Sequence, residues 1–223
     1  MNIRLRHSPS LHEAARLDAL RRLELLDTPP SEAFDRITRM AAQLFNLPIA
    51  AVSLTDADRQ WFKSGYGISH DTIPRLKAPC SMVSDSGNVL VVTDLLEHPG
   101  LCDSPLAMGG IRFYAGAPLT TSEGYCLGAM CVLGTEPRQA SRDECRALTD
   151  LASMVMSQIE LQHAFGRIEP VSGLPNRNGF IIDFNDLELA EPEGGGAPGG
   201  AGQPGQPAGT ERRPARDGFR LPR

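Results

Sequence analysis

The spacing of apolar residues predicts two helices at the start of the chain. Ser10 and Glu13 have the spacing of an N-terminal capping box, which predicts a helix over residues 11–26. A second helix is predicted over 31–46, ended by Pro48. Five apolar residues line one side of it and are expected to face the core: Phe34, Ile37, Ala41, Leu44 and Phe45.

Shorter apolar runs predict strands. Residues 49–55 are expected to form a central strand, and 59–66 its hairpin partner. Residues 111–138 contain two apolar strands joined by the polar turn 121–124. Gly124 can adopt the positive φ that such a turn needs. Between these hairpins, residues 67–106 lose their periodicity, and only 89–93 is strand-like. Long irregular segments in compact domains are often functional.

A second capping box, Ser141 with Glu144, opens a helix expected to run over about 141–165. Its apolar residues include Leu148, Leu151, Ala152, Val155, Ile159 and Leu161. A further seam alternates spacings of four and three residues: Met154, Gln158, Leu161, Phe165 and Ile168. Two interpretations stay open: the helix packs only on the sheet, or its second half also pairs with another copy of the chain.

Composition limits the possible functions. The 223 residues are 41% hydrophobic, which suffices for one domain with a core. The net charge of −5 argues against a nucleic-acid surface, and we find no signal peptide or membrane-spanning run, so we expect a cytoplasmic protein. The five cysteines form no CxxC pair. Cys126 and Cys131 are expected on opposite faces of their strand, so they favour free thiols over a metal site.

Three segments together resemble GAF domains found in front of cyclic di-GMP enzymes and sensor kinases. They read LRRLELLDTPPSEAFDRITRMAAQLFNLPIAAVSLTDADRQWFKSGYG, IRFYAGAPL and LGAMCVLGTEPR, and the resemblance covers residues 11–165 after an N-terminal arm, 1–10. It implies an α/β fold of the α+β type. That fold has an antiparallel sheet of about six strands, helices on one face, and the irregular segment as a lid over the other. It also implies a sensor module.

A second resemblance begins after the long helix. Residues 169–177, EPVSGLPNR, resemble the opening of a GGDEF domain, usually written D-x-L-T-G-L-P-N-R, with Glu169 and Ser172 as departures. By this resemblance Asn176 is the remnant of a guanine-nucleotide contact. No GGDEF signature, metal-binding aspartates or EAL motif follows, so we interpret 166–190 as a degenerate stub.

The last residues, 191–223, are rich in Gly and Pro and are expected to be disordered. We favour a frameshift or truncation of the gene as their origin. A natural flexible tail is the competing interpretation, and the DNA sequence past codon 190 distinguishes the two.

The expected ligand pocket draws on residues of the lid and the strands: Trp61, Cys80, Ser81, Asp94, Cys102, Phe113 and Tyr114. Strand alternation sends Phe113 and Tyr114 to opposite faces. Asp94 either contacts a ligand or caps the short helix that follows it. Ser81 stands where bilin-binding GAF domains have a His, which argues against a bilin.

These residues suggest a cytoplasmic sensor that either binds an unknown small molecule or mediates dimerisation, and that regulates a cyclic di-GMP (GGDEF/EAL) output module truncated in this chain. A homodimer through helix 141–165 is the expected assembly, with no cofactor, metal, nucleic acid or membrane partner. The alternative is a thiol enzyme similar to free methionine-(R)-sulfoxide reductases, in which Cys80 or Cys102 attacks the sulfoxide and the other resolves it. The carboxylates of that family are missing here, so we assign no catalytic residue.

Overall fold

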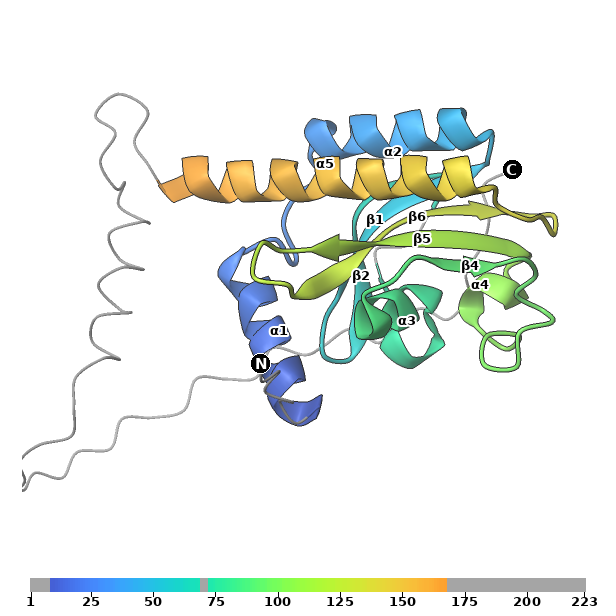
Figure 1. The fold of residues 1–223 in the computed structure, drawn as a ribbon, viewed down its shortest axis with the longest axis horizontal. Helices are drawn as coiled ribbons and strands as arrows, with labels where there is room; N and C mark the ends of the chain where they lie inside the picture. Colours follow the sequence, from blue (N-terminus) through green and yellow to red (C-terminus); the bar gives the residue numbers. More distant parts are fainter. Residues whose placement is uncertain (1–8, 69–71, 168–223) are drawn as a thin grey trace, which may run out of the picture. The chain divides into compact units, whose positions relative to one another are not determined.

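The computed structural model describes residues 9–68 and 72–167, and its centre is a six-stranded antiparallel sheet (Figure 1). The strands follow the order β3-β2-β1-β6-β5-β4 across the sheet. They are β1 (Ile49–Thr55), β2 (Arg59–Tyr66), β3 (Thr72–Pro74), β4 (Leu90–Val92), β5 (Phe113–Thr120) and β6 (Cys126–Gly134). The predicted α+β fold with about six antiparallel strands is confirmed.

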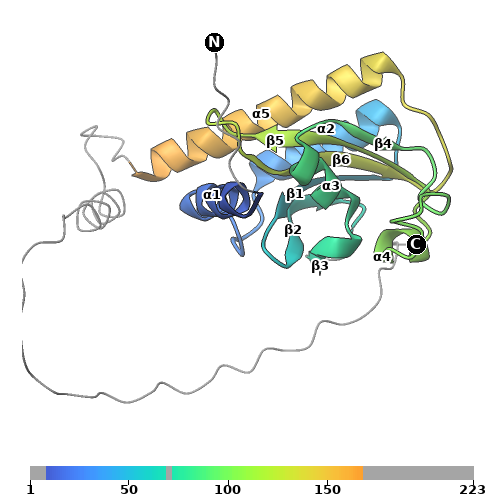
Figure 2. The same ribbon diagram turned by 60° about the horizontal axis from the view of Figure 1, so that its bottom comes forward.

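Helices cover both faces of this sheet. The two long helices α2 (Glu32–Phe45) and α5 (Arg142–Arg167) lie side by side on one face, and α1 (Pro9–Arg22) packs near β6 (Figures 1 and 2). The other face carries the lid, which is more regular than its sequence suggests. It contains a 3-10 turn (Arg75–Lys77) and the short helices α3 (Pro79–Ser86) and α4 (Pro105–Met108) (Figure 2). Of the described residues, those up to His163 form one compact unit.

The ends of the helices show which of the predicted capping interactions form. At the start of α5, the Ser141 amide donates to a Glu144 carboxylate oxygen at 2.8 Å, and the Glu144 amide to the Ser141 hydroxyl at 3.2 Å, as predicted. Helix α2 ends at Asn46, whose φ of 50° lies in the left-handed region. The first predicted capping box is wrong, because α1 begins before Ser10 and the Glu13 carboxylate binds Arg16 and Arg75 instead.

Two apolar cores form, one on each face. Phe113 belongs to the core under α2 and α5, and Tyr114 to the core under the lid, which confirms their predicted alternation. Leu44 does not join the predicted stripe of α2, since it is 64% exposed. Among the described helices, none combines the length and the apolar character that a bilayer crossing requires.

Two bulges change which way side chains point. In β2 the pairing steps from Ser64 to Phe62 opposite consecutive residues of β1, which makes Lys63 an extra residue. In β6 the same kind of step makes Leu127 extra. The prediction that Cys126 and Cys131 point to opposite faces is therefore wrong. The Cys126 thiol lies 3.8 Å from a carbonyl of α3, and the Cys131 thiol lies 3.8 Å from Cys80, also in α3.

Strands β1 and β6 approach each other so closely at Gly128 that adding one methyl group there is expected to destabilise the fold. A Cβ on Gly128 would lie 2.0 Å from the Ser53 carbonyl oxygen and 2.9 Å from the Leu54 Cα. Because backbone must move to admit it, we expect Gly128→Ala to lower the free energy of unfolding by about 3 kcal/mol. Urea denaturation measures this. Gly100→Ala, whose Cβ meets nothing closer than 3.8 Å, is the control, and equal losses in both variants would contradict the packing argument.

Candidate functional site

The seven residues of the expected pocket do not come together in the structure. Trp61 and Phe113 lie in the core under α2 and α5, whereas Cys80 and Tyr114 lie in the core under the lid. The Ser81 hydroxyl donates to the Ala78 carbonyl inside the lid. These positions separate the expected pocket into two faces of the sheet, and a ligand contact by any one of the seven stays a prediction.

Under the lid, aromatic and sulfur atoms fill the space against the sheet. The Tyr114 hydroxyl donates to the Cys80 thiol at 3.2 Å, and the Cys80 and Cys131 sulfurs are 3.8 Å apart. The Tyr114 ring reaches over Gly116, where a Cβ would lie 2.2 Å from its hydroxyl. Burial raises the pKa of Tyr114 well above its ordinary value, so this hydroxyl stays protonated. Cys80 is only 1% exposed, which keeps its thiol from any substrate in this conformation.

Asp94 and Arg112 neutralise one another at the edge of the lid. The Arg112 guanidinium makes two bonds to the Asp94 carboxylate, one of them 2.7 Å long, and lowers the pKa of that carboxyl. The Leu96 amide donates to the same carboxylate at 3.0 Å, but residues 95–97 form a turn, so the short helix that Asp94 was expected to cap is not there. Arg112 therefore holds an internal anion. The fourth lid candidate, Cys102, lies on a loop with its thiol 3.9 Å from the Pro99 carbonyl.

A network of charges ties α1 to the lid. Glu13 accepts two bonds of 2.8 Å from the buried Arg16 and one of 2.5 Å from Arg75, in the 3-10 turn. Arg16 also donates to the Thr55 carbonyl at 2.7 Å, and Arg75 donates to Asp85 of α3 at 3.0 Å. The Arg16 guanidinium holds the pKa of Glu13 at about 2, against an ordinary 4.5. One carboxylate thus joins the N-terminal helix, the end of β1 and the lid.

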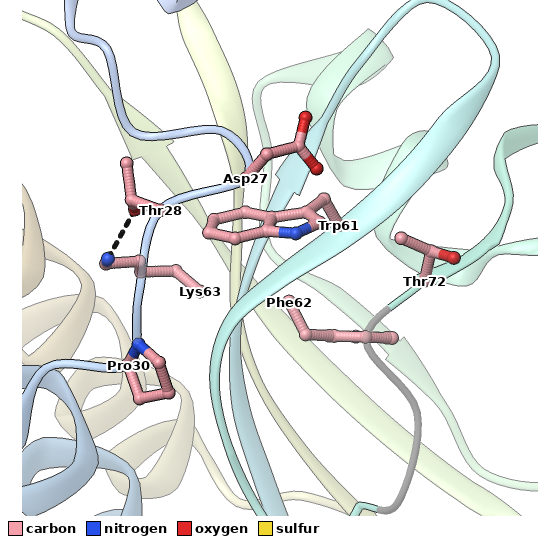
Figure 3. A pocket seen from close by; sticks show the side chains of 7 residues that line it. All are labelled: Asp27, Thr28, Pro30, Trp61, Phe62, Lys63 and Thr72. Carbon is pink, nitrogen blue, oxygen red and sulfur yellow. Dashed lines mark hydrogen bonds between the residues drawn. The ribbon is translucent and has the colours of Figure 1, made fainter. Parts of the chain in front are cut away.

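A cleft opens where the connection between α1 and α2 meets strands β2 and β3 (Figure 3). We call it the rim cleft, and its volume is about 360 Å³, which is in the range of small-molecule pockets. Seven residues line it: Asp27, Thr28, Pro30, Trp61, Phe62, Lys63 and Thr72. Of the expected site residues, Trp61 lines this cleft, and the described structure adds six that the sequence did not single out.

Lys63 is the charged group in the wall of the rim cleft. Its ammonium donates to the Thr28 hydroxyl at 2.6 Å (Figure 3) and to the Pro29 carbonyl at 2.8 Å. It also lies 5.7 Å from the centre of the Phe34 ring and 5.8 Å from that of Trp61. Burial lowers the pKa of Lys63, because the charged form loses hydration. Its burial follows from the β2 bulge, which brings both Lys63 and Ser64 to the α2 side.

The acid of the cleft is already paired. Asp27 accepts bonds of 2.9 and 2.5 Å from the Arg59 guanidinium, which lowers its pKa. Within the described part of the chain, no group of three or more His, Cys, Asp or Glu side chains could hold a metal ion. The groups that line the rim cleft are therefore one ammonium, two hydroxyls, one carboxylate already paired with Arg59, and aromatic rings.

Comparisons with known proteins agree with this fold. The family model of the GAF domain matches residues 29–159. The chain is 38% identical over 159 residues to a cyclic di-GMP phosphodiesterase of Pseudomonas aeruginosa. The match covers 70% of this chain but only 27% of that relative, so the chain spans about a quarter of its length.

Solved structures support the fold alone, because their sequence identities are low. The GAF domain of a phosphoenolpyruvate-protein phosphotransferase from Coxiella burnetii is 14% identical with a TM-score of 0.54, covering 71% of this chain and 99% of its own. Free methionine-R-sulfoxide reductase from Neisseria meningitidis is 17% identical with a TM-score of 0.50, covering 68% of this chain and 86% of its own.

The Glu13 network predicts an acid-sensitive contribution to stability. The pKa of Glu13 is lower in the folded chain than its ordinary 4.5, so the network stabilises the fold above about pH 4.5, and the gain is lost as pH falls toward 2. We expect Glu13→Gln to lower the free energy of unfolding by about 1 kcal/mol near neutral pH, since the carboxylate is partly solvated. Urea denaturation between pH 7 and 2 measures the difference. A gap that does not shrink toward pH 2 would contradict this role.

Proposed function

The chain belongs to the GAF domain family, and on that premise we propose that it senses a signal and regulates a cyclic di-GMP output module. The observation that carries the proposal is the 38% identity over 159 residues to a cyclic di-GMP phosphodiesterase. That alignment takes in most of the chain and a minor part of the relative, as expected of a regulatory segment joined to a separate output. The output itself is absent from the motifs of this sequence.

The described residues end at 167, the last residue of α5. The rest of the stub assigned to 166–190, including Asn176, and the tail 191–223 therefore lie outside them. We keep them as part of the proposal on their sequence alone. We also propose a cytoplasmic location. All five cysteines fall in the described residues and are unpaired, which suits a reducing compartment.

We propose a binding role without a catalytic step. The thiol chemistry weighed above needs an accessible nucleophile, and Cys80 is buried beneath the lid with its sulfur between Tyr114 and Cys131. A likeness to a reductase at 17% identity supports a shared fold and carries no activity to this chain.

Helix α5 is the proposed route from the sensor to a second copy of the chain. One side of it packs on the sheet through residues such as Val155 and Ile159. Met154 and Leu161, seven residues apart, face solvent with 54% and 51% of their surfaces exposed. Two exposed apolar side chains at heptad spacing favour pairing with an identical helix. The further seam residues Phe165 and Ile168 are not among the side chains described.

The dimer is tested by placing charge on this exposed side. We expect Met154→Lys with Leu161→Lys to convert a dimer to a monomer in sedimentation velocity, because two ammonium groups would face two others across the interface. Ser153→Lys with Glu160→Lys, also exposed and seven residues apart, is the matched control and is expected to remain dimeric. Equal behaviour of the two double variants would contradict pairing through this seam.

Regulation is tested in the Pseudomonas aeruginosa relative. Three purified proteins are compared: the native phosphodiesterase, a hybrid in which residues 1–167 of this chain replace the aligned segment, and a protein without that segment. We expect the hybrid to hydrolyse cyclic di-GMP at a rate that differs several-fold from that of the shortened protein, since a regulatory segment shifts a conformational equilibrium. Identical rates for the hybrid and the shortened protein would contradict the proposed function.

A further inference from the structure

We propose that the rim cleft binds a small aromatic monocarboxylate, with the carboxylate at the Lys63 ammonium and the ring against Trp61. The inference rests on the proposed function in one respect: it takes the bound molecule to be the signal that the sensor detects. The binding itself stands on the geometry of the cleft, which lies at the edge of the sheet, between Trp61 of the core under α2 and α5 and Phe62, which packs on the core under the lid.

A buried cation without an ion-pair partner within 4.0 Å carries the inference, with the Asp35 carboxylate acting on it only from a greater distance. Lys63 is only 6% exposed, yet no described carboxylate lies within 4.0 Å of its Nζ. Its two hydrogen bonds use two of the three N–H groups of the ammonium. Burying an unpaired charge is costly, so an anion entering the cleft would gain a charge-assisted bond at a site whose desolvation the fold has already achieved.

The charges around Lys63 select a singly charged ligand. The guanidinium of Arg59, on the same strand, is occupied by Asp27 and Asp56, which leaves Lys63 as the cation free to receive an anion among the described cleft residues. The Asp27 carboxylate lines the same cleft and repels a second negative charge. A phosphate or nucleotide, with its larger charge, fits this balance poorly, whereas one carboxylate matches one ammonium.

The walls of the cleft select a flat, apolar body. Trp61 lies between Asp27 and Lys63 in the close-up view, with Pro30 below Lys63 and the Phe62 ring toward Thr72 (Figure 3). An aromatic ring can stack against the indole while its carboxylate reaches the ammonium beside it. A cavity of about 360 Å³ suits a molecule of one or two rings.

Trp61 also provides the measurement, because it is the chain's single tryptophan. Benzoate is titrated into the full-length protein while the fluorescence of Trp61 is recorded, and benzamide, of similar shape but uncharged, is titrated in parallel. We expect saturable quenching by benzoate with a dissociation constant on the order of 1 mM, as its few atoms allow, and at least tenfold weaker binding of benzamide.

The two lysines of the chain make matched variants. Lys63→Met keeps the aliphatic stem and removes the charge, and we expect at least a tenfold loss of benzoate affinity. Lys77→Met removes the exposed lysine that pairs with Asp103 in the lid, and we expect wild-type binding. Circular dichroism checks that both variants fold. Should Lys63→Met not fold, the comparison of benzoate with benzamide on the wild-type chain decides the question.

Three outcomes overturn the proposal. They are a linear, unsaturable fluorescence response to benzoate, equal binding of benzoate and benzamide, and undiminished benzoate binding by folded Lys63→Met. The proposed function fails separately, since it depends on cyclic di-GMP hydrolysis by the hybrid. Benzoate binding without regulation in the hybrid would leave the site standing, and regulation without binding would leave the sensor role standing.

Discussion

The two central strands, β1 and β6, are buried along their whole length on both faces, and the rest of the structure depends on covering them. Their close approach is possible because Gly128 has no side chain to meet the Ser53 carbonyl. Helices α2 and α5 cover one face with a continuous apolar core. The other face is covered by the lid, which packs on a second apolar core, and the ion pair of Glu13 with Arg75 joins that lid to α1.

This arrangement assigns different chemistry to the two faces. Under the lid, Tyr114 lies over Gly116 against the buried thiols. At the rim of the other face, the bulge in β2 turns Lys63 toward the connection before α2, where it meets two oxygens and two aromatic rings. One inserted residue in a strand thus places a cation among apolar groups.

The sequence was sufficient for the sheet, the long helices and the alternation of Phe113 and Tyr114, because these follow from periodicity over many residues. Prediction from the sequence failed where a single inserted residue decides which face of the sheet a side chain points to. The bulges moved Cys126 onto the face of Cys131 and brought Lys63 inward, and no period-two pattern reveals an inserted residue. Helix α3 was missed because eight residues beginning with Pro79 show no helical repeat. The expected pocket combined residues that lie on opposite faces of the sheet: Trp61 and Phe113 face the long helices, whereas Tyr114 faces the lid.

The location of the rim cleft bears on how a bound molecule could be sensed. Lys63 bonds directly to Thr28 and Pro29, which precede α2, and the neighbouring Ser64 bonds to Thr38 and Asp35 within α2. An anion bound to the remaining N–H of the Lys63 ammonium would lie next to these two bonds, at the start of a helix that lies beside α5 (Figure 1). Signal transfer by this route needs no movement of the lid, whose ion pairs with Glu13 and Asp94 oppose opening. The proposed ligand and the proposed dimer contact would then be coupled through the two long helices on one side of the sheet.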